Sequence, residues 1–555
     1  MGSFIAETSS YSMVAIFAAF LFVNIVVFFY KKPEKHTKTY FLQTLLVVMF
    51  HAIGYITLYV RSDDVRYFLF FAFQEIMLFA LAMIYRTIYR HMSHLLLNNM
   101  LMLLFIGFVI LGRLAFENAI RQFIITIVAF AISIMIPWFI LKFGKLKKLT
   151  YFYAGIGIFL LGAVWLTGAV TNGSRLAFKL FGMSFQPSEF IKISLVFFNA
   201  AILSDRKNKY RYWISALFTA VHVMLLVLSR DLGSACIYLG TYVFMLFLAN
   251  KNVLTLLCSM VSGAGAAVLA YKLFSHVRIR VQTWLDPWGD MDNKSYQLSQ
   301  SLFAIGTGGY FGMGIMRGNP FSIPVVHEDF VFSAIAEELG VIFSILLIFI
   351  YLFIVLHVLR MSFRVKDEFH GLILAGLAIT LGIQVFLTIG GGSRLVPLTG
   401  VTLPLISMGG SSLTATILMF SVLHGIYIKE FTDYDEEELL EALEEAEEDY
   451  DDENAFETNE LTVSAVQSSD FVDSENIYIE TKVISRKKNK TVSNEGLKDE
   501  FTGASQKENT FISDVKKTEE VIEIKTEQKN NIKKFSEGEL DWEKDEYQGN
   551  ARKDW

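Results

Sequence analysis

Long apolar segments alternate with short polar ones along residues 1–430. Thirteen of them approach the length of about 20 residues that crosses a bilayer core. Because lipid offers the backbone no hydrogen-bond partners, runs this long are predicted to be helices rather than strands of a β-barrel. The predicted spans cover 12–30, 41–60, 67–85, 97–115, 120–141, 150–171, 189–204, 212–229, 232–250, 253–273, 330–358, 371–390 and 403–428.

Lysine and arginine in the short connections predict the orientation. One set of alternate connections is basic and the other is nearly neutral, and basic connections face the cytoplasm. We therefore expect the N-terminus outside, the C-terminal tail inside, and 274–328 as one large external loop. The basic set comprises Lys31, Lys32, Lys35, Lys38, Arg86, Arg90, Lys145, Lys147, Lys148, Arg206, Lys207, Lys209, Arg211, Lys251, Arg360, Arg364 and Lys366.

Composition divides the chain further. Only 19% of the residues are charged, against about 25% in soluble domains. The net charge of −6 is the sum of +14 over residues 1–430 and −20 over residues 431–555. We expect an all-α polytopic membrane protein with three helices over 1–92, a ten-helix core over 93–430 and a largely disordered acidic tail over 431–555. Within the tail, 433–448 is predicted to be helical, and the tail is either a solvated extension or a docking segment for a cytoplasmic partner.

Ionisable residues inside the apolar region mark candidate functional positions, because charge is costly in lipid. Glu189 and Lys192 lie one turn apart at the start of a predicted helix. They are either a structural ion pair or a pair that holds Lys192 ready for a phosphate. Upstream, Arg175 and Lys179 could cradle an anion or belong to an ordinary surface loop. Arg230 and Asp231 are expected to pair with each other or with a neighbour.

The predicted external loop carries further candidates. Lys272, His276, Arg278 and Arg280 make its entry basic, and Trp284 and Trp288 suit an interfacial depth. An amphipathic surface helix is predicted over 296–305. The glycine-rich stretch 306–318 is interpreted as flexible backbone near an extended substrate, because a dinucleotide loop would need a strand and a helix around it.

Asp329 falls where this loop enters the next predicted span. Between aromatic neighbours its carboxyl group would lose water, which raises a pKa toward the range of a general base. Capping of the helix is the alternative, because aspartate is a favoured cap. Two turns deeper, Glu337 or Glu338 must find a partner. Further on, the Gly- and Pro-rich stretch 390–412 predicts a broken or re-entrant helix, and Arg394 adds a cation there.

These motifs in this order resemble the SEDS family (shape, elongation, division and sporulation) of FtsW, RodA and SpoVE, over roughly 93–430. The resemblance rests on Gln186-Pro-Ser-Glu-Phe-Ile-Lys, Asp231-Leu-Gly, Leu285-Asp-Pro-Trp, Tyr296-Gln, Gly308-Gly-Tyr-Phe-Gly, His327-Glu-Asp-Phe and Pro397-Leu-Thr-Gly through Gly409-Gly-Ser-Ser. The sequence departs from the family pattern at Met408, where tyrosine is commoner, and at Val325 and Glu328 in the aspartate motif.

The resemblance implies an inverting peptidoglycan glycosyltransferase that polymerises lipid II at the outer face of the bacterial cytoplasmic membrane with a class B penicillin-binding protein. It implies that Asp329 is catalytic and that Arg175, Glu189 and Lys192 are functional. Arg278, Arg280 and Arg394 are additional candidates for binding the pyrophosphate.

These residues do not establish a cofactor, although a divalent cation such as Mg²⁺ or Mn²⁺ could help neutralise the pyrophosphate. Beyond lipid II, the expected partners are the penicillin-binding protein and membrane lipids, and not nucleic acid. A lipid-linked precursor transporter and a non-catalytic scaffold are the alternative functions. The motifs do not separate division, elongation and sporulation members.

Overall fold

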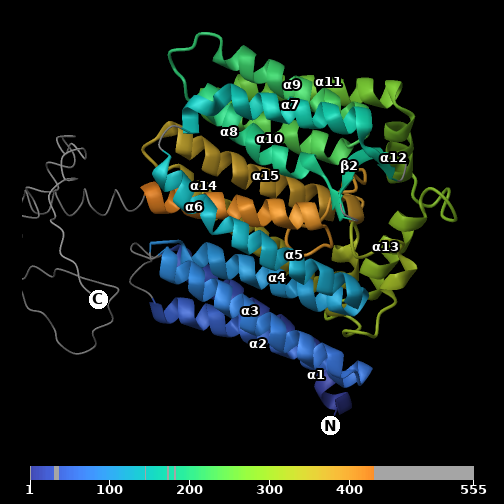
Figure 1. Cartoon of the computed structure of the whole chain (residues 1–555). Helices are drawn as coiled ribbons and strands as arrows, with labels where there is room; N and C mark the ends of the chain where they lie inside the picture. Colours follow the sequence, from blue (N-terminus) through green and yellow to red (C-terminus); the bar gives the residue numbers. More distant parts are fainter. Residues whose placement is uncertain are drawn as a thin grey trace, which may run out of the picture. The chain divides into compact units, whose positions relative to one another are not determined.

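The computed structural model describes residues 2–29, 37–89, 91–143, 146–171, 174–180 and 183–430, which belong to one compact unit (Figure 1). The tail from residue 431, with the helix expected over 433–448, lies outside the described residues. The helices are α1 (Gly2–Phe28), α2 (Thr37–Ser62), α3 (Val65–Ile88), α4 (His94–Leu114), α5 (Phe116–Ser133), α6 (Met135–Lys142), α7 (Thr150–Thr167), α8 (Pro187–Leu203), α9 (Arg211–Leu228), α10 (Leu232–Asn250), α11 (Val253–Leu273), α12 (Ser275–Leu285), α13 (Tyr296–Thr307), α14 (Val331–Ser362), α15 (Glu368–Gly392) and a terminal helix (Gly410–Glu430).

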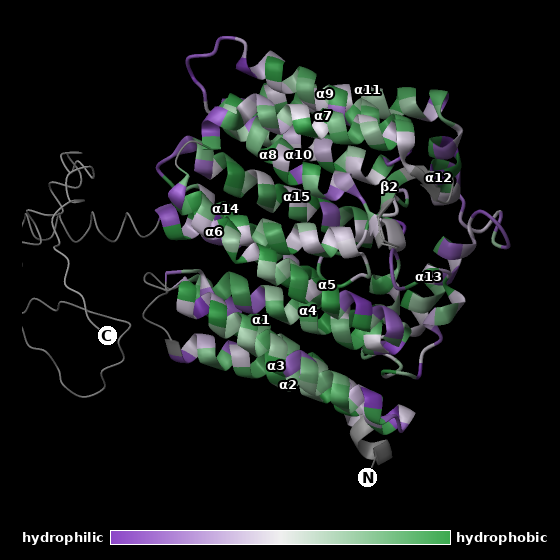
Figure 2. Ribbon diagram, viewed as in Figure 1, coloured by the Kyte–Doolittle hydropathy of each residue, from purple (hydrophilic) through white to green (hydrophobic). Residues whose placement is uncertain are grey.

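The prediction of a polytopic helical membrane protein is confirmed. Twelve helices in the described part of the chain are long and apolar enough to cross a membrane, and apolar residues follow most of their length (Figure 2). The predicted span 189–204 is the exception, because it forms α8, which has 17 residues. Helix α8 packs against α7, α9, α10 and α15, so protein rather than lipid surrounds most of it.

The three N-terminal helices form a layer against the core. Helix α1 packs on α2 and α14, and α2 packs on α4 (Figure 1). The rings of Phe17 and Phe50 lie 4.8 Å and 5.9 Å from that of Phe343 in α14. Lipid is as apolar as these side chains, so close packing and interhelical hydrogen bonds hold such a layer in place.

A small antiparallel sheet was not predicted. Its strands are β1 (Ala169–Thr171), β2 (Ser174–Leu180) and β3 (Met183–Phe185), in the order β1-β2-β3. Helix α7 therefore ends at Thr167, short of the predicted boundary at 171. Contacts of β2 with α7 and α8 hold the sheet over the ends of these helices.

Helix α14 is broken at Gly340, which has φ +87°. The backbone of the glycine-rich stretch crosses it there, because Met313 N donates to Glu337 O and Gly314 N donates to Glu338 O, both at 2.9 Å. A Cβ on Gly312 would lie 2.2 Å from Glu338 O. The expectation of flexible backbone was wrong at these positions, since the glycines permit a close and hydrogen-bonded crossing.

The predicted broken helix is confirmed at residues 393–409, which are irregular between α15 and the terminal helix. The terminal helix begins at Gly410 rather than at residue 403. Side chains from other helices bond the buried backbone of this stretch. Gln122 Nε2 donates to Ser407 O at 3.0 Å, and Tyr351 Oη donates to Pro404 O at 2.5 Å. Irregular backbone is tolerated at membrane depth when protein groups satisfy it in this way.

Candidate active site

Four helices begin close together at the end of the bundle that carries α12 and α13, here called the loop end (Figure 1). Gln186 N, before α8, donates to Ser411 Oγ in the terminal helix at 3.0 Å. Ser188 Oγ donates to Asp231 Oδ2, before α10, at 3.0 Å. Met408 N donates to His327 O, before α14, at 2.8 Å. Helix N-termini carry partial positive charge, so this arrangement favours an anion.

Asp329 lies at this convergence and does not cap α14. The N-cap residue is Phe330, and no side chain bonds the cap. A Cβ on Gly400 would lie 3.5 Å from Asp329 Oδ2 and 3.9 Å from Arg280 Nη2. Gly400 has φ +71°, a left-handed backbone conformation that glycine adopts readily, and it lies within contact distance of both the acid and the guanidinium.

The surroundings of Asp329 suit a general base. Burial, and to a smaller extent the neighbouring carboxylate of Glu328, raises the pKa of Asp329 to about 6. The positive charge of Arg280 opposes this rise. A carboxylate with a pKa near the working pH can accept a proton and later release it.

Arg280 is bonded to the stretch before the terminal helix and feels the charge of two acids. Its Nη1 donates to Leu398 O at 2.8 Å. Burial lowers the pKa of Arg280, while Asp329 and Asp231 act in the opposite direction. Arg280 is therefore a fixed cation close to Asp329.

Asp231 finds its partners on α8 and at the start of α10. Its Oδ1 accepts from Ser234 N at 3.0 Å, and its Oδ2 accepts from Ser188 Oγ and from Gln186 Nε2 at 3.3 Å. Burial raises the pKa of Asp231 despite these bonds. Asp231 fixes the start of α8 against that of α10, and so supports the positions of Glu189 and Lys192.

Glu189 and Lys192 form a buried ion pair, which is one of the two interpretations that the sequence left open. Lys192 Nζ donates to Glu189 Oε2 at 2.6 Å and to Gln384 Oε1 at 2.7 Å. Gln384 Nε2 in turn donates to Thr402 O at 3.1 Å. The pair thereby connects α8 and α15 to the stretch that carries Gly400.

Two of the other predicted cations, Arg278 and Arg394, make contacts away from Asp329. Arg278 is exposed and donates to Lys272 O at 3.0 Å. Arg394 donates to Trp284 O and Leu285 O at the end of α12. Arg175 pairs with Val170 in the sheet, but its side chain lies outside the described part. Among the predicted cations whose side chains are described, the structure brings Arg280 close to Asp329.

The two buried glutamates of α14 accept hydrogen bonds near the place where the glycine-rich stretch crosses this helix. Glu338 Oε1 accepts from Arg113 Nε at 3.0 Å and from Met316 N at 3.1 Å. Glu337 Oε1 accepts from Asn319 N at 2.7 Å. The prediction that one of them must find a partner is confirmed, and the contacts indicate a structural role.

Sequence reasoning did not identify Gly400 as a site residue, and it treated Asp231 as a structural residue. Both belong to motifs that carried the family resemblance, Asp231-Leu-Gly and Leu-Thr-Gly400. A glycine at the end of a motif containing Pro397 and Thr399 was the available signal, because glycine often marks a close approach.

The described residues give a divalent cation little support at Asp329. Three ligand atoms converge, among those residues, only at Asp367, His370 and Glu430. Asp367 and His370 lie at the start of α15, away from the loop end. A cation at Asp329 would therefore rely mainly on oxygen ligands from a phosphate-bearing substrate.

The chain is similar in sequence to known proteins. The family model for FtsW, RodA and SpoVE, described as cell cycle proteins, matches residues 94–431. The peptidoglycan glycosyltransferase RodA of Mycobacterium bovis is 33% identical over 332 residues, covering 56% of this chain and 71% of the relative. The stage V sporulation protein E of Bacillus subtilis is 33% identical over 264 residues, covering 46% and 72%.

A solved structure is also similar. It describes the coordination of polymerization and crosslinking by a peptidoglycan synthase complex. Its matching chain is 28% identical, with a TM-score of 0.53, and the match covers 61% of this chain and 98% of that chain.

Proposed function

Because the chain belongs to the family of FtsW, RodA and SpoVE, we propose that it polymerises lipid II into glycan strands at the outer face of the cytoplasmic membrane. The peptidoglycan glycosyltransferase activity follows from the family and from relatives that carry this name. One observation carries the proposed chemistry. Asp329, with a pKa raised to about 6, lies beside Arg280 where four helix N-termini meet.

In the proposed reaction, Asp329 removes the proton from a hydroxyl group of the acceptor sugar. The hydroxyl oxygen attacks the anomeric carbon of the donor, the bond from that carbon to the pyrophosphate oxygen breaks, and undecaprenyl pyrophosphate leaves. Direct displacement inverts the anomeric centre, which turns an α-linked donor into a β-linked polymer. General base catalysis of this kind typically contributes about 10²–10⁴-fold.

The leaving pyrophosphate needs positive charge. We assign this role first to Arg280, which is fixed by Leu398 O close to Asp329. The converging helix starts add partial charges of the same sign. Lys192 helps to hold α8 and α15 together near the site, because it bonds both Glu189 and Gln384. Groups already fixed in place are effective because they need no rearrangement as charge develops.

The proposed orientation puts the loop end outside and the chain from residue 431 in the cytoplasm. It rests on the basic connections at the opposite end of the helices. We also propose a class B penicillin-binding protein as the partner, since the similar solved chain belongs to a complex that coordinates polymerization with crosslinking.

The test is glycan synthesis by the purified full chain supplied with lipid II, with and without the partner. We expect Asp329→Asn to reduce polymerisation at least about 10²-fold and Arg280→Lys to reduce it strongly. Arg278→Ala is the control, because Arg278 lies on the same helix as Arg280 but is exposed and donates to Lys272 O. Undiminished synthesis by Asp329→Asn would refute the proposed base. Lipid II movement across liposomes without chain growth would indicate a transporter instead.

A further inference from the structure

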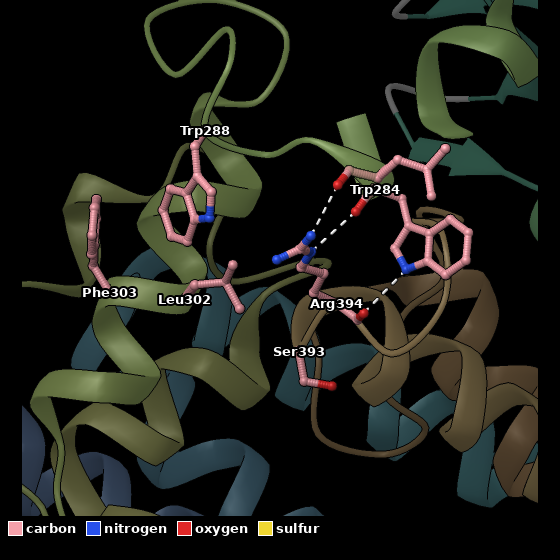
Figure 3. Close-up of a pocket in the computed structure, with 7 residues that line it drawn as sticks. Trp284, Trp288, Leu302, Phe303, Ser393 and Arg394 are labelled. Carbon is pink, nitrogen blue, oxygen red and sulfur yellow. Dashed lines mark hydrogen bonds between the residues drawn. The ribbon is translucent and has the colours of Figure 1, made fainter. Parts of the chain in front are cut away.

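A hollow of about 660 Å³ opens at the loop end, beside the start of the external loop (Figure 3). Aromatic and aliphatic side chains form its walls, and one guanidinium lies among them. The lining residues are Trp284, Leu285, Trp288, Leu302, Phe303, Ser393 and Arg394. The walls come from α12, α13 and the segments that follow α12 and α15.

The walls of the hollow are fixed by contacts with one another. Trp284 Nε1 donates to Arg394 O at 3.1 Å. Arg394 Nε donates back to Trp284 O at 3.1 Å, and Arg394 Nη2 donates to Leu285 O at 2.9 Å. The Trp288 ring packs 5.6 Å from that of Phe303. Figure 3 shows the Arg394 side chain between the two tryptophans. Its bonds to carbonyls use two of its five N–H donors.

The hollow adjoins the candidate active site along α12. Trp284 follows Arg280 by four residues, so both lie on one face of the helix, about 6 Å apart along its axis. Arg280 bonds Leu398 and Trp284 bonds Arg394. The same helix face thus joins both sites to one short stretch of chain.

We propose that this hollow binds sugar units of the glycan strand next to its reacting end. The inference rests on the proposed function and adds a strand-binding site to it. A pyranose ring presents an apolar C–H face that can lie against an indole, while its hydroxyl and acetamido groups remain free for hydrogen bonds. Apolar walls with a few placed polar groups are typical of ligand sites. A fixed guanidinium can donate to sugar or peptide oxygens.

Interfacial anchoring in lipid is the other explanation for two tryptophans at this end of the bundle. Two observations favour a sugar. The indole N–H of Trp284 donates to the protein's own Arg394 O rather than being left for a lipid headgroup. The hollow also lies about one helical turn along α12 from Arg280, to which the proposed function assigns the pyrophosphate at the reacting end.

The experiment compares the full-length wild-type chain with Trp288→Ala and Trp288→Phe, where the phenylalanine keeps an aromatic face. Trp213→Ala is the control, because Trp213 is also exposed but lies near the start of α9, away from the loop end. Two quantities are measured on each purified variant. One is the ratio of long strands to first-coupling product made from lipid II. The other is binding of a lipid-free peptidoglycan tetrasaccharide, followed by calorimetry.

For Trp288→Ala we expect a strand-to-first-product ratio at least about threefold lower and tetrasaccharide binding about tenfold weaker, as expected for one lost aromatic contact. Trp288→Phe should recover most of both, and Trp213→Ala should match the wild type. Wild-type strand length and binding in Trp288→Ala would overturn the inference. So would a defect that appears only when the lipid composition changes, since that indicates anchoring. A wild-type chain that makes no first-coupling product would instead refute the proposed function.

Discussion

At the scale of single residues, the protonation of Asp329 should set the pH dependence of the reaction. A general base must be ionised, and the pKa of Asp329 is raised to about 6. Below that pH the ionised fraction, and with it kcat/KM, should fall about tenfold per pH unit, whereas above pH 7 the rate should be level. Initial rates of lipid II polymerisation between pH 4.5 and 8 measure this profile.

The neighbouring acid provides the control for this pH profile. Glu328 is exposed, and its negative charge raises the pKa of Asp329. Glu328→Gln should therefore shift the rising part of the profile to lower pH while the plateau rate changes little. An unshifted profile in this variant would assign the titration to a group other than Asp329.

Gly400 offers a second prediction at this scale. An alanine methyl group there would make only ordinary contacts with Asp329 and Arg280, but the backbone has φ +71° and would have to strain or move beside these two groups. A left-handed conformation costs a residue with a side chain about 1–2 kcal/mol. We expect Gly400→Ala to lose at least about tenfold in polymerisation and to unfold at a lower temperature.

The control for Gly400 is Gly306→Ala. Gly306 is helical, and a Cβ there would have nothing within 4 Å. This variant should keep both activity and melting temperature, because alanine favours a helix over glycine. If both variants behave alike, the left-handed backbone at Gly400 does not matter for catalysis.

At the scale of elements, the break in α14 depends on glycines that let two backbones touch. A Cβ on Gly312, at φ +79°, would lie 2.2 Å from Glu338 O. Gly309 has φ +57°, but a Cβ there would meet nothing within 4 Å. Gly309→Ala should therefore cost only the backbone strain of about 1 kcal/mol.

We expect Gly312→Ala to cost clearly more than Gly309→Ala, because the crossing must open to admit the methyl group. Unfolding of both variants in the same detergent measures the difference. Equal melting temperatures would mean that the crossing is loose, and that Glu337 and Glu338 are held by something other than this contact.

The sequence predicted the helices better than the contacts between them. Long apolar runs leave little choice in lipid, so the spans and the broken stretch near Pro404 could be predicted. The sheet at β2 and the glycine crossing depend on packing between distant segments, which no local pattern encodes. Likewise the sequence could propose both Arg278 and Arg280, but only the fold shows that Arg280 approaches Asp329.

At the scale of the whole molecule, the N-terminal layer is joined to the core by buried polar side chains. Asn24 in α1 exchanges hydrogen bonds of 2.9 Å and 3.1 Å with Asn99 in α4. Gln43 in α2 donates to Asn24 at 2.9 Å and accepts from Asn98 at 3.1 Å. Interhelical bonds in membranes average about 0.6 kcal/mol and reach about 1.7 kcal/mol. Together they specify how the layer sits on α4.

This network predicts what happens when the layer is removed. The most apolar 18-residue stretch of α4 is fully buried in the complete chain, so deleting residues 1–92 would turn Asn98 and Asn99 toward lipid. Uncompensated polar groups are costly there. We expect the 93–555 fragment to aggregate or melt at a clearly lower temperature than the full chain, and co-expressed 1–92 to copurify with it and restore its stability.

Asn24→Ala should weaken the copurification, whereas Phe22→Ala, at an exposed position on the same helix, should not. A monodisperse 93–555 fragment with the melting temperature of the full chain would show that the layer is an added anchor rather than part of the folded core.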